Sequence, residues 1–219
     1  MSPLAEETDT DATDDAYRIG SHWRRQGDFV KAYRHLSIAA AAGHTDAMTE
    51  LGIIAWEHGL VAKAVELHQA AATAGNARAA GNLGSLLVDL ARDEEAEHWL
   101  RIAVDAGQLM PASELGELLR HRGDFAEAER WQRVAVDAGN PRAACRLGLL
   151  FHDQGRDQEA EHWFRRALAD HHPEAMNRLG LLAARRGDTD EAKRWYREAA
   201  AAGHQLAEHN LATLTNPRR

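Results

Sequence analysis

A glycine that recurs every 32 residues constrains the fold more than any other feature of the chain. Each of these glycines follows a leucine or, once, an isoleucine, and the series is Gly20, Gly52, Gly84, Gly116, Gly148 and Gly180. Two further series keep the same spacing, with one substitution in each: Gly27, Gly59, Ala91, Gly123, Gly155, Gly187 and Gly43, Gly75, Gly107, Gly139, His171, Gly203. Chance does not hold so many columns in phase without an insertion, so the chain consists of tandem repeats.

One repeat, residues 173–204, predicts a pair of helices. The first helix is expected over residues 173–186, where apolar residues recur at helical spacing, and Gly187 is expected to end it. The second helix follows directly and ends at Gly203. Its start carries a capping signature, an aspartate three residues before a glutamate, at Asp188 and Glu191 and again at Asp124 and Glu127.

Small and large residues alternate between columns in a way that predicts close packing. Glycine inside the first helix costs about 0.5–1 kcal/mol relative to alanine, which a close approach of the second helix would offset. A tryptophan column, Trp99, Trp131, Trp163 and Trp195, is expected to fill the wider gap between repeats, and His35 and Leu67 occupy it in the first two. No single helix pair can bury its own apolar faces, so the pairs must stack.

These columns resemble two related families of helical repeats. The first helix and turn, from the Leu-Gly step through Gly187 and Asp188 to Ala192, are similar to the tetratricopeptide repeat, and the segment from Ala192 to Ala207 is similar to the Sel-like repeat. The period is shorter than the 34 residues of the tetratricopeptide unit. The resemblance implies an all-α fold, a right-handed α-solenoid (superhelix) of stacked antiparallel helix pairs, with about six and a half repeats.

The ends of the chain differ from the repeats in charge and periodicity. Residues 1–13 lack apolar periodicity and are expected to be a disordered acidic tail, residues 14–215 the solenoid, with a polar seventh first helix over residues 205–214, and residues 216–219 a C-terminal tail. The net charge is −8, and six acidic residues lie within residues 1–15, which leaves −2 for the rest.

This charge pattern and the apolar pattern exclude several classes of partner. The nearly neutral body lacks the basic footprint of a nucleic-acid binder, and no apolar run is long enough to span a membrane. The first residues do not read as a signal peptide, and Cys145 is the only cysteine, so we expect a cytoplasmic location.

The resemblance implies a partner-binding groove lined by the first helices, which points to another protein or a peptide as the partner. Its C-terminal half is expected to hold Arg142, Arg146, Asn177, Arg178 and Arg185, and repeats one and two offer Tyr17, Arg24, Arg25 and Glu50. Arginine binds carboxylates with two parallel hydrogen bonds, so the expected ligand is an acidic or carboxylate-ended segment. The alternative is that these arginines form solvated helix faces paired with neighbouring glutamates.

Trp56 departs from its column, which otherwise holds Arg24, Val88, Arg120, His152 and Ala184. It is either an anchor for a partner or a packing residue. Cys145 is expected to pack, the thirteen histidines form no recognisable ligand motif, and the sequence predicts no metal, no cofactor and no catalysis. Two alternatives to an adaptor stay open: a self-assembling scaffold, and autoinhibition in which the acidic segment folds back on the arginines.

Overall fold

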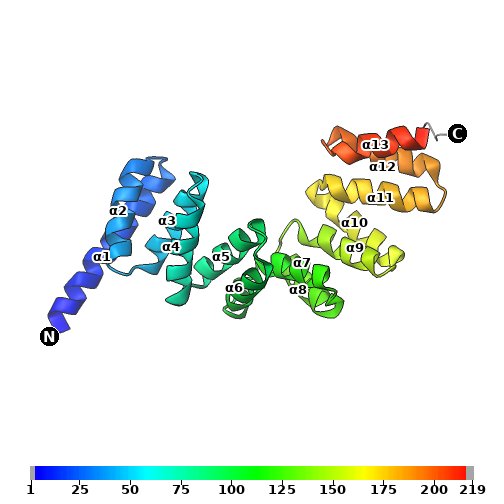
Figure 1. The fold of residues 1–219 in the computed structure, drawn as a ribbon. Helices are drawn as coiled ribbons and strands as arrows, with labels where there is room; N and C mark the ends of the chain where they lie inside the picture. Colours follow the sequence, from blue (N-terminus) through cyan, green and yellow to red (C-terminus); the bar gives the residue numbers. More distant parts are fainter. Residues whose placement is uncertain (1–2, 216–219) are drawn as a thin grey trace. The chain divides into compact units, whose positions relative to one another are not determined.

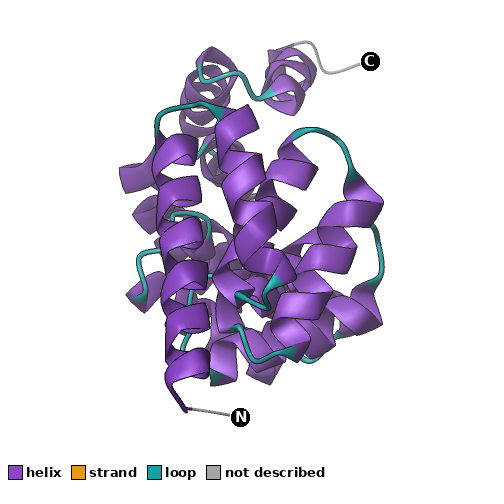
Figure 2. Ribbon diagram, turned by 90° about the vertical axis from the view of Figure 1, so that its left-hand side faces the viewer, coloured by secondary structure: helices purple, strands orange, loops and turns teal. Residues whose placement is uncertain are grey.

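The computed structural model describes residues 3–215, and every regular element in them is helical (Figure 1 and Figure 2). The thirteen α-helices of this range form six antiparallel hairpins followed by a single helix. They are α1 (Pro3–Arg25), α2 (Phe29–Ala41), α3 (Thr45–Glu57), α4 (Val61–Thr73), α5 (Ala77–Asp89), α6 (Asp93–Asp105), α7 (Ala112–Arg122), α8 (Phe125–Asp137), α9 (Ala143–Asp153), α10 (Asp157–Ala167), α11 (Pro173–Arg185), α12 (Thr189–Ala201) and α13 (Gln205–Thr215). The all-α repeat solenoid predicted from the sequence is therefore confirmed.

The chain divides into two compact units between Pro111 and Ala112, where the sequence predicted one continuous solenoid. Unit 1 contains α1–α6 and unit 2 contains α7–α13. The 32-residue spacing places the start of α7 at Leu109, but the helix begins three residues later. Pro111 explains the delay, because proline disfavours helical geometry in the residue before it, which is Met110.

The N-terminal segment also differs from its prediction. Residues 3–13 belong to α1, whereas the sequence predicted disorder there. Pro3 occupies the first helical position, where its fixed φ angle favours a helix start. The predicted C-terminal tail, residues 216–219, lies outside the described residues.

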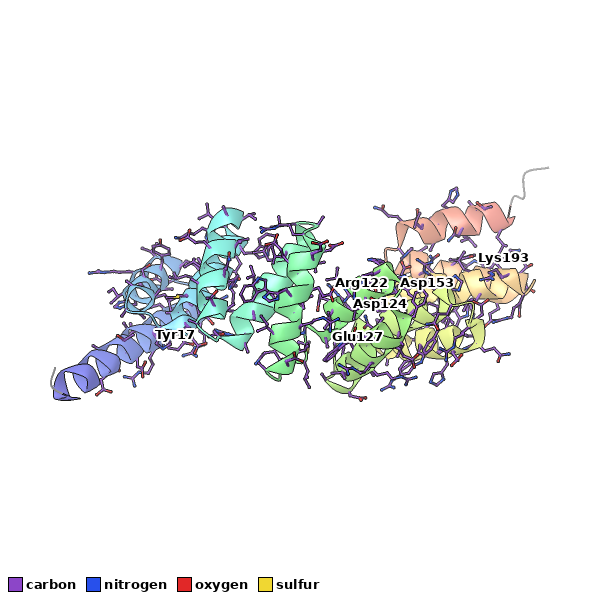
Figure 3. The ribbon with its side chains drawn as sticks, turned by 60° about the horizontal axis from the view of Figure 1, so that its bottom comes forward. Tyr17, Arg122, Asp124, Glu127, Asp153 and Lys193 are labelled. Carbon is purple, nitrogen blue, oxygen red and sulfur yellow. The ribbon has the colours of Figure 1, made fainter. Side chains whose placement is uncertain are left out.

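The turn residues follow the sequence analysis closely. Gly187 and Gly203 adopt positive φ angles of 82° and 86°, as the helix ends require. Asp188 caps α12 by accepting a hydrogen bond of 3.0 Å from the backbone N–H of Glu191. The same prediction was wrong at Asp124, which makes no capping bond because its carboxylate accepts a hydrogen bond from Arg122 instead (Figure 3).

Each glycine of the Leu-Gly series, from Gly20 to Gly180, lies directly under one side chain of the second helix of its hairpin. A Cβ atom added at Gly180 would stand 2.6 Å from the ring of Tyr196, and one added at Gly52 would stand 2.6 Å from the ring of His68. The side chains in this covering column are Leu36, His68, Leu100, Gln132, Phe164 and Tyr196. The glycine therefore sets how closely the two helices of a hairpin approach, as predicted.

Candidate binding surfaces

The first helices of unit 1 surround a polar pocket of about 530 Å³. We call the surface formed by the first helix of each hairpin the first-helix face. Tyr17 of α1 lines this pocket and is visible on that helix in Figure 3. The charged residues of its wall are Arg24 and Arg25 of α1, Glu50 and Glu57 of α3, and Arg78 of α5. Three arginines against two glutamates leave the wall with one excess positive charge.

Glu50 holds two of these arginines in place. Its carboxylate is buried and accepts hydrogen bonds from Arg78, at 2.8 Å, and from Arg24. Arg24 also reaches Glu57 at 3.4 Å. Arg25 is exposed and makes no ion pair with any described residue. The pocket thus combines a fixed ion-pair network with one guanidinium that is available to a ligand.

Trp56 lies on the same face of unit 1, beside a smaller pocket of about 280 Å³. Its side chain is 42% exposed, and Asn82 and Ser85 of α5 share the pocket wall. His68 of α4 forms the buried part of the wall, and its Nδ1 atom has no hydrogen-bond partner among the described residues. Burial, with a smaller effect from Arg78, lowers the pKa of His68 to about 4, so the imidazole is neutral at pH 7.

In unit 2, two of the predicted binding residues join neighbouring first helices instead of facing an empty groove. Arg146 of α9 donates to the Oγ atom of Ser113 at 2.9 Å, and Ser113 donates to Gln132 at 3.0 Å. Asn177 of α11 is buried and accepts a hydrogen bond of 2.9 Å from Asn210 of α13. These contacts connect one repeat to the next.

The remaining predicted arginines of unit 2 fall into two groups. Arg178 donates to Glu174 in its own helix at 2.5 Å, and Arg185 lies 3.3 Å from Asp157. Arg142 is exposed, precedes the first residue of α9, and its guanidinium makes no ion pair within residues 3–215. The structure therefore does not gather the arginines predicted from the sequence into one open ladder.

Glu174 of α11 contacts two basic side chains on this face. Besides Arg178, it contacts the Nε2 atom of His204 at 2.6 Å. Burial alone would raise the pKa of Glu174, but hydrogen bonds from His204 and Arg178 outweigh it and hold the pKa below its usual value. Glu174 is consequently ionised at neutral pH, and its charge satisfies Arg178 from within the protein.

The described residues include neither a reactive cysteine nor a cluster of metal ligands. Burial raises the pKa of the Cys145 thiol to about 12, so this thiol is a packing group at neutral pH. Within the described range, no three histidine, cysteine, aspartate or glutamate side chains cluster in a way that could hold a metal ion. No described helix is long and apolar enough to cross a membrane.

Sequence reasoning placed Tyr17, Arg24, Arg25 and Glu50 on the first-helix face but favoured the arginines of repeats five and six. It missed the role of Arg78, which completes the network around Glu50. The signal available was a charge change in one column: Asp46 in repeat two is followed by Arg78 in repeat three. A residue of opposite charge one repeat later can reach across to the neighbouring helix.

Comparison with protein families identifies the repeat. A tetratricopeptide repeat model matches residues 17–78, 136–171 and 145–207, which together make up more than half of the chain. The chain belongs to the tetratricopeptide repeat family. A second tetratricopeptide model matches residues 112–138, and a Sel1 repeat model matches residues 82–108. The mixed resemblance seen in the sequence is therefore confirmed, and curated protein sequences gave no match.

Several known structures share this repeat fold. The protective antigen c5321 of uropathogenic Escherichia coli, which displays an SLR fold, is 18% identical with a TM-score of 0.72, and the match covers 94% of this chain but only 50% of c5321. PilF of Pseudomonas aeruginosa is 18% identical with a TM-score of 0.74, covering 93% of this chain and 99% of PilF. The MamA protein is 23% identical with a TM-score of 0.59, covering 73% and 92%.

At these identities the likeness concerns the fold alone. Tetratricopeptide repeat proteins are generally non-catalytic, and the fold supports a role for this repeat protein as a protein-interaction scaffold or adaptor.

Proposed function

We propose that this repeat protein is a non-catalytic adaptor that binds an acidic or carboxylate-ended segment of another protein on its first-helix face. The observation that carries the proposal is the 530 Å³ pocket of unit 1, in which Arg25 lies free beside the network of Arg24, Glu50 and Arg78. A fixed network of this kind costs a ligand little ordering entropy, and a free guanidinium offers two parallel donors to a carboxylate.

Arg142 supports a second point of contact in unit 2, since its guanidinium is exposed and forms no ion pair among the described residues. Arg146 and Arg178 are less suited to a direct role, because their hydrogen bonds to Ser113 and Glu174 would have to break first. Reversing their charge would also disturb packing, so these two residues make a poor test of binding.

A peptide-binding measurement with matched variants tests the proposal. Fluorescent peptides that end in a free carboxylate after an acidic run are titrated against wild type, Arg25→Glu, Arg142→Glu and Arg197→Glu. Arg197 is the control, since it is exposed and free of ion pairs within the described range but belongs to the second helix α12. We expect Arg25→Glu to weaken binding by about tenfold or more.

The controls define what would contradict the proposal. Equal affinity for peptides with a C-terminal amide and neutral side chains would exclude carboxylate recognition. An Arg197→Glu variant as weak as Arg25→Glu would point to the overall charge of the protein instead of the pocket.

The cytoplasmic location, self-assembly and autoinhibition by the acidic segment stay predictions. Light scattering at graded concentrations tests self-assembly, and a strict monomer would exclude it. Removing the acidic N-terminal residues tests autoinhibition, which requires tighter peptide binding by the shortened protein.

A further inference from the structure

An open apolar groove lies on the opposite side of unit 1, between the second helices α2 and α4. It measures about 580 Å³, and α3 forms its floor with Leu51, Ile54 and Ala55. Phe29, Val30 and Tyr33 of α2 form one wall, and Leu60, Lys63 and Leu67 form the other. We call this the α2/α4 groove. It shares one wall residue, Phe29, with the arginine pocket, and no arginine lines it.

The groove walls are exposed to an unusual degree for apolar side chains. Val30 is 83% exposed, Leu60 59% and Tyr33 57%. Lys63 is the only charged residue in the wall, and it pairs with Glu66 at 2.8 Å. A contiguous apolar patch of this kind on a folded protein marks a surface that another molecule covers.

The same columns are charged in later repeats. Where repeat one has Tyr33 and Ser37, repeats three, four and five have the ion pairs Glu97–Arg101, Glu129–Arg133 and Glu161–Arg165, at 2.9, 2.9 and 2.6 Å. The repeat therefore does not require apolar residues at these positions. Apolar residues in the Tyr33 column are confined to repeats one and two, which have Tyr33 and Val65. This is the pattern expected of a binding surface.

Later repeats also show what fills this space. Trp99 packs against alanines of α4, α5 and α6, and the ring of Trp163 in α10 lies under the guanidinium of Arg133 in α8, 5.5 Å away. Trp163 is only 8% exposed, so an indole occupies the space between consecutive second helices. In α4 this column holds Leu67, which packs against the neighbouring clusters but is smaller than tryptophan.

We propose that the α2/α4 groove receives a bulky aromatic side chain, tryptophan or phenylalanine, from an amphipathic helix of a partner protein. The aromatic ring takes the place that an indole of this chain takes in later repeats. Acidic residues beside the aromatic residue would face Lys63, the one charged residue of the groove wall. This surface is separate from the arginines of the proposed adaptor function and does not depend on them.

The test uses fluorescence anisotropy with a lactam-bridged helical peptide that carries one tryptophan flanked by glutamates. The bridge is needed because short peptides are marginally helical in water. The matched peptide has alanine in place of the tryptophan. The full chain is compared with Leu67→Trp, which fills the groove from inside as later repeats do, and with Tyr33→Glu, which introduces the charge found in repeats three to five.

We expect wild type to bind the tryptophan peptide and the alanine peptide to bind at least about tenfold more weakly. Leu67→Trp should lower affinity by a similar factor and melt at the same or a higher temperature, because its ring is buried in the groove. If Leu67→Trp fails to fold, Tyr33→Glu carries the test, since its side chain is at the surface. Ile38→Ser, on α2 but outside the groove, should bind like wild type.

Three results would overturn the proposal. The first is no binding of the tryptophan peptide to wild type. The second is wild-type affinity for the tryptophan peptide in both Leu67→Trp and Tyr33→Glu, which would place the peptide elsewhere. The third is dimerisation of wild type that Leu67→Trp abolishes, since a second copy of the chain would then occupy the groove.

Discussion

The Nε2 atom of His204 lies 2.6 Å from the Glu174 carboxylate and thereby connects the start of α13 to the first turn of α11. Two other links have the same register. Asn76 donates to Asp46 at 2.9 Å, and His44 lies 3.4 Å from Asp14. In each case the residue that precedes a first helix contacts a carboxylate thirty residues earlier, in the previous first helix. These links fix the register of neighbouring repeats.

Breaking this link should destabilise the end of unit 2. We expect Glu174→Gln to lower the free energy of unfolding by about 1–2 kcal/mol at pH 7, since Glu174 also loses its charged contact with Arg178. The pKa of Glu174 is lowered in the folded state, so its contribution is present above the unfolded pKa and is lost as pH falls through the folded value. Urea denaturation of both proteins at pH 7 and at acid pH measures this; a difference that persists at acid pH would contradict it.

His68 should make the protein sensitive to mild acid. Its pKa is lowered by burial to about 4, from about 6.5 when unfolded, so the unfolded state binds more protons between these values. Stability is therefore complete above about pH 6.5 and falls as pH drops towards 4, by up to about 3 kcal/mol. His68→Leu, which copies Leu36 and Leu100, should lack this component of the pH dependence.

The same variant gives a second readout. At pH 7 we expect His68→Leu to be about 1 kcal/mol more stable, since the unsatisfied Nδ1 atom is gone. Melting curves from pH 7.5 to 4.5 check both effects. Parallel curves for the two proteins would show that His68 is not the titrating group.

An alanine at Gly180 should separate α11 from α12. Its Cβ atom would stand 2.6 Å from the ring of Tyr196, so we expect a loss of about 1–3 kcal/mol in the free energy of unfolding. The clash predicts coupling: Tyr196→Ala should cost less in the Gly180→Ala background than in wild type. Additive losses in a double-mutant cycle would show that the glycine acts through helix propensity alone.

Glycine at position 91 should stabilise the protein. Ala91 follows the cap of α5 with a φ angle of 55°, where the other five repeats have glycine. Left-handed geometry costs alanine about 1–2 kcal/mol, so Ala91→Gly is expected to gain about 1 kcal/mol. Ala106→Gly, at a φ of −85°, is the control and should be neutral or destabilising. Equal effects at both positions, measured by thermal melting, would contradict the strain argument.

Periodicity made most of the fold predictable, because a residue type that recurs every 32 residues has the same backbone geometry in each repeat. The glycine turns, the hairpins and the packing of Trp163 all followed from it. The break before α7 did not, since it depends on Pro111 at a single position. The extension of α1 through residues 3–13 was missed because a polar helix has no apolar period.

The binding surfaces were less predictable than the fold. Helical spacing placed Arg146 and Arg178 on the first-helix face, but it could not show that Ser113 and Glu174 would already satisfy them. Pairing depends on which residue the neighbouring repeat offers, and on rotamers. The α2/α4 groove was missed for a related reason: its signal was an absence, Leu67 in a tryptophan column, on the side of the repeat that the family resemblance did not emphasise.

The strict 32-residue period also means that the chain can be shortened without regard to where its helices begin. Removing residues 156–187 would join Gly155 to Asp188, so that α9 is followed by α12 and Gly148 faces Tyr196 in place of Phe164. One aromatic ring replaces another over the same glycine, and every later column stays in phase. Removing one residue fewer would shift each following side chain by about 100° around its helix, so gain and loss of length in such a protein come in whole units.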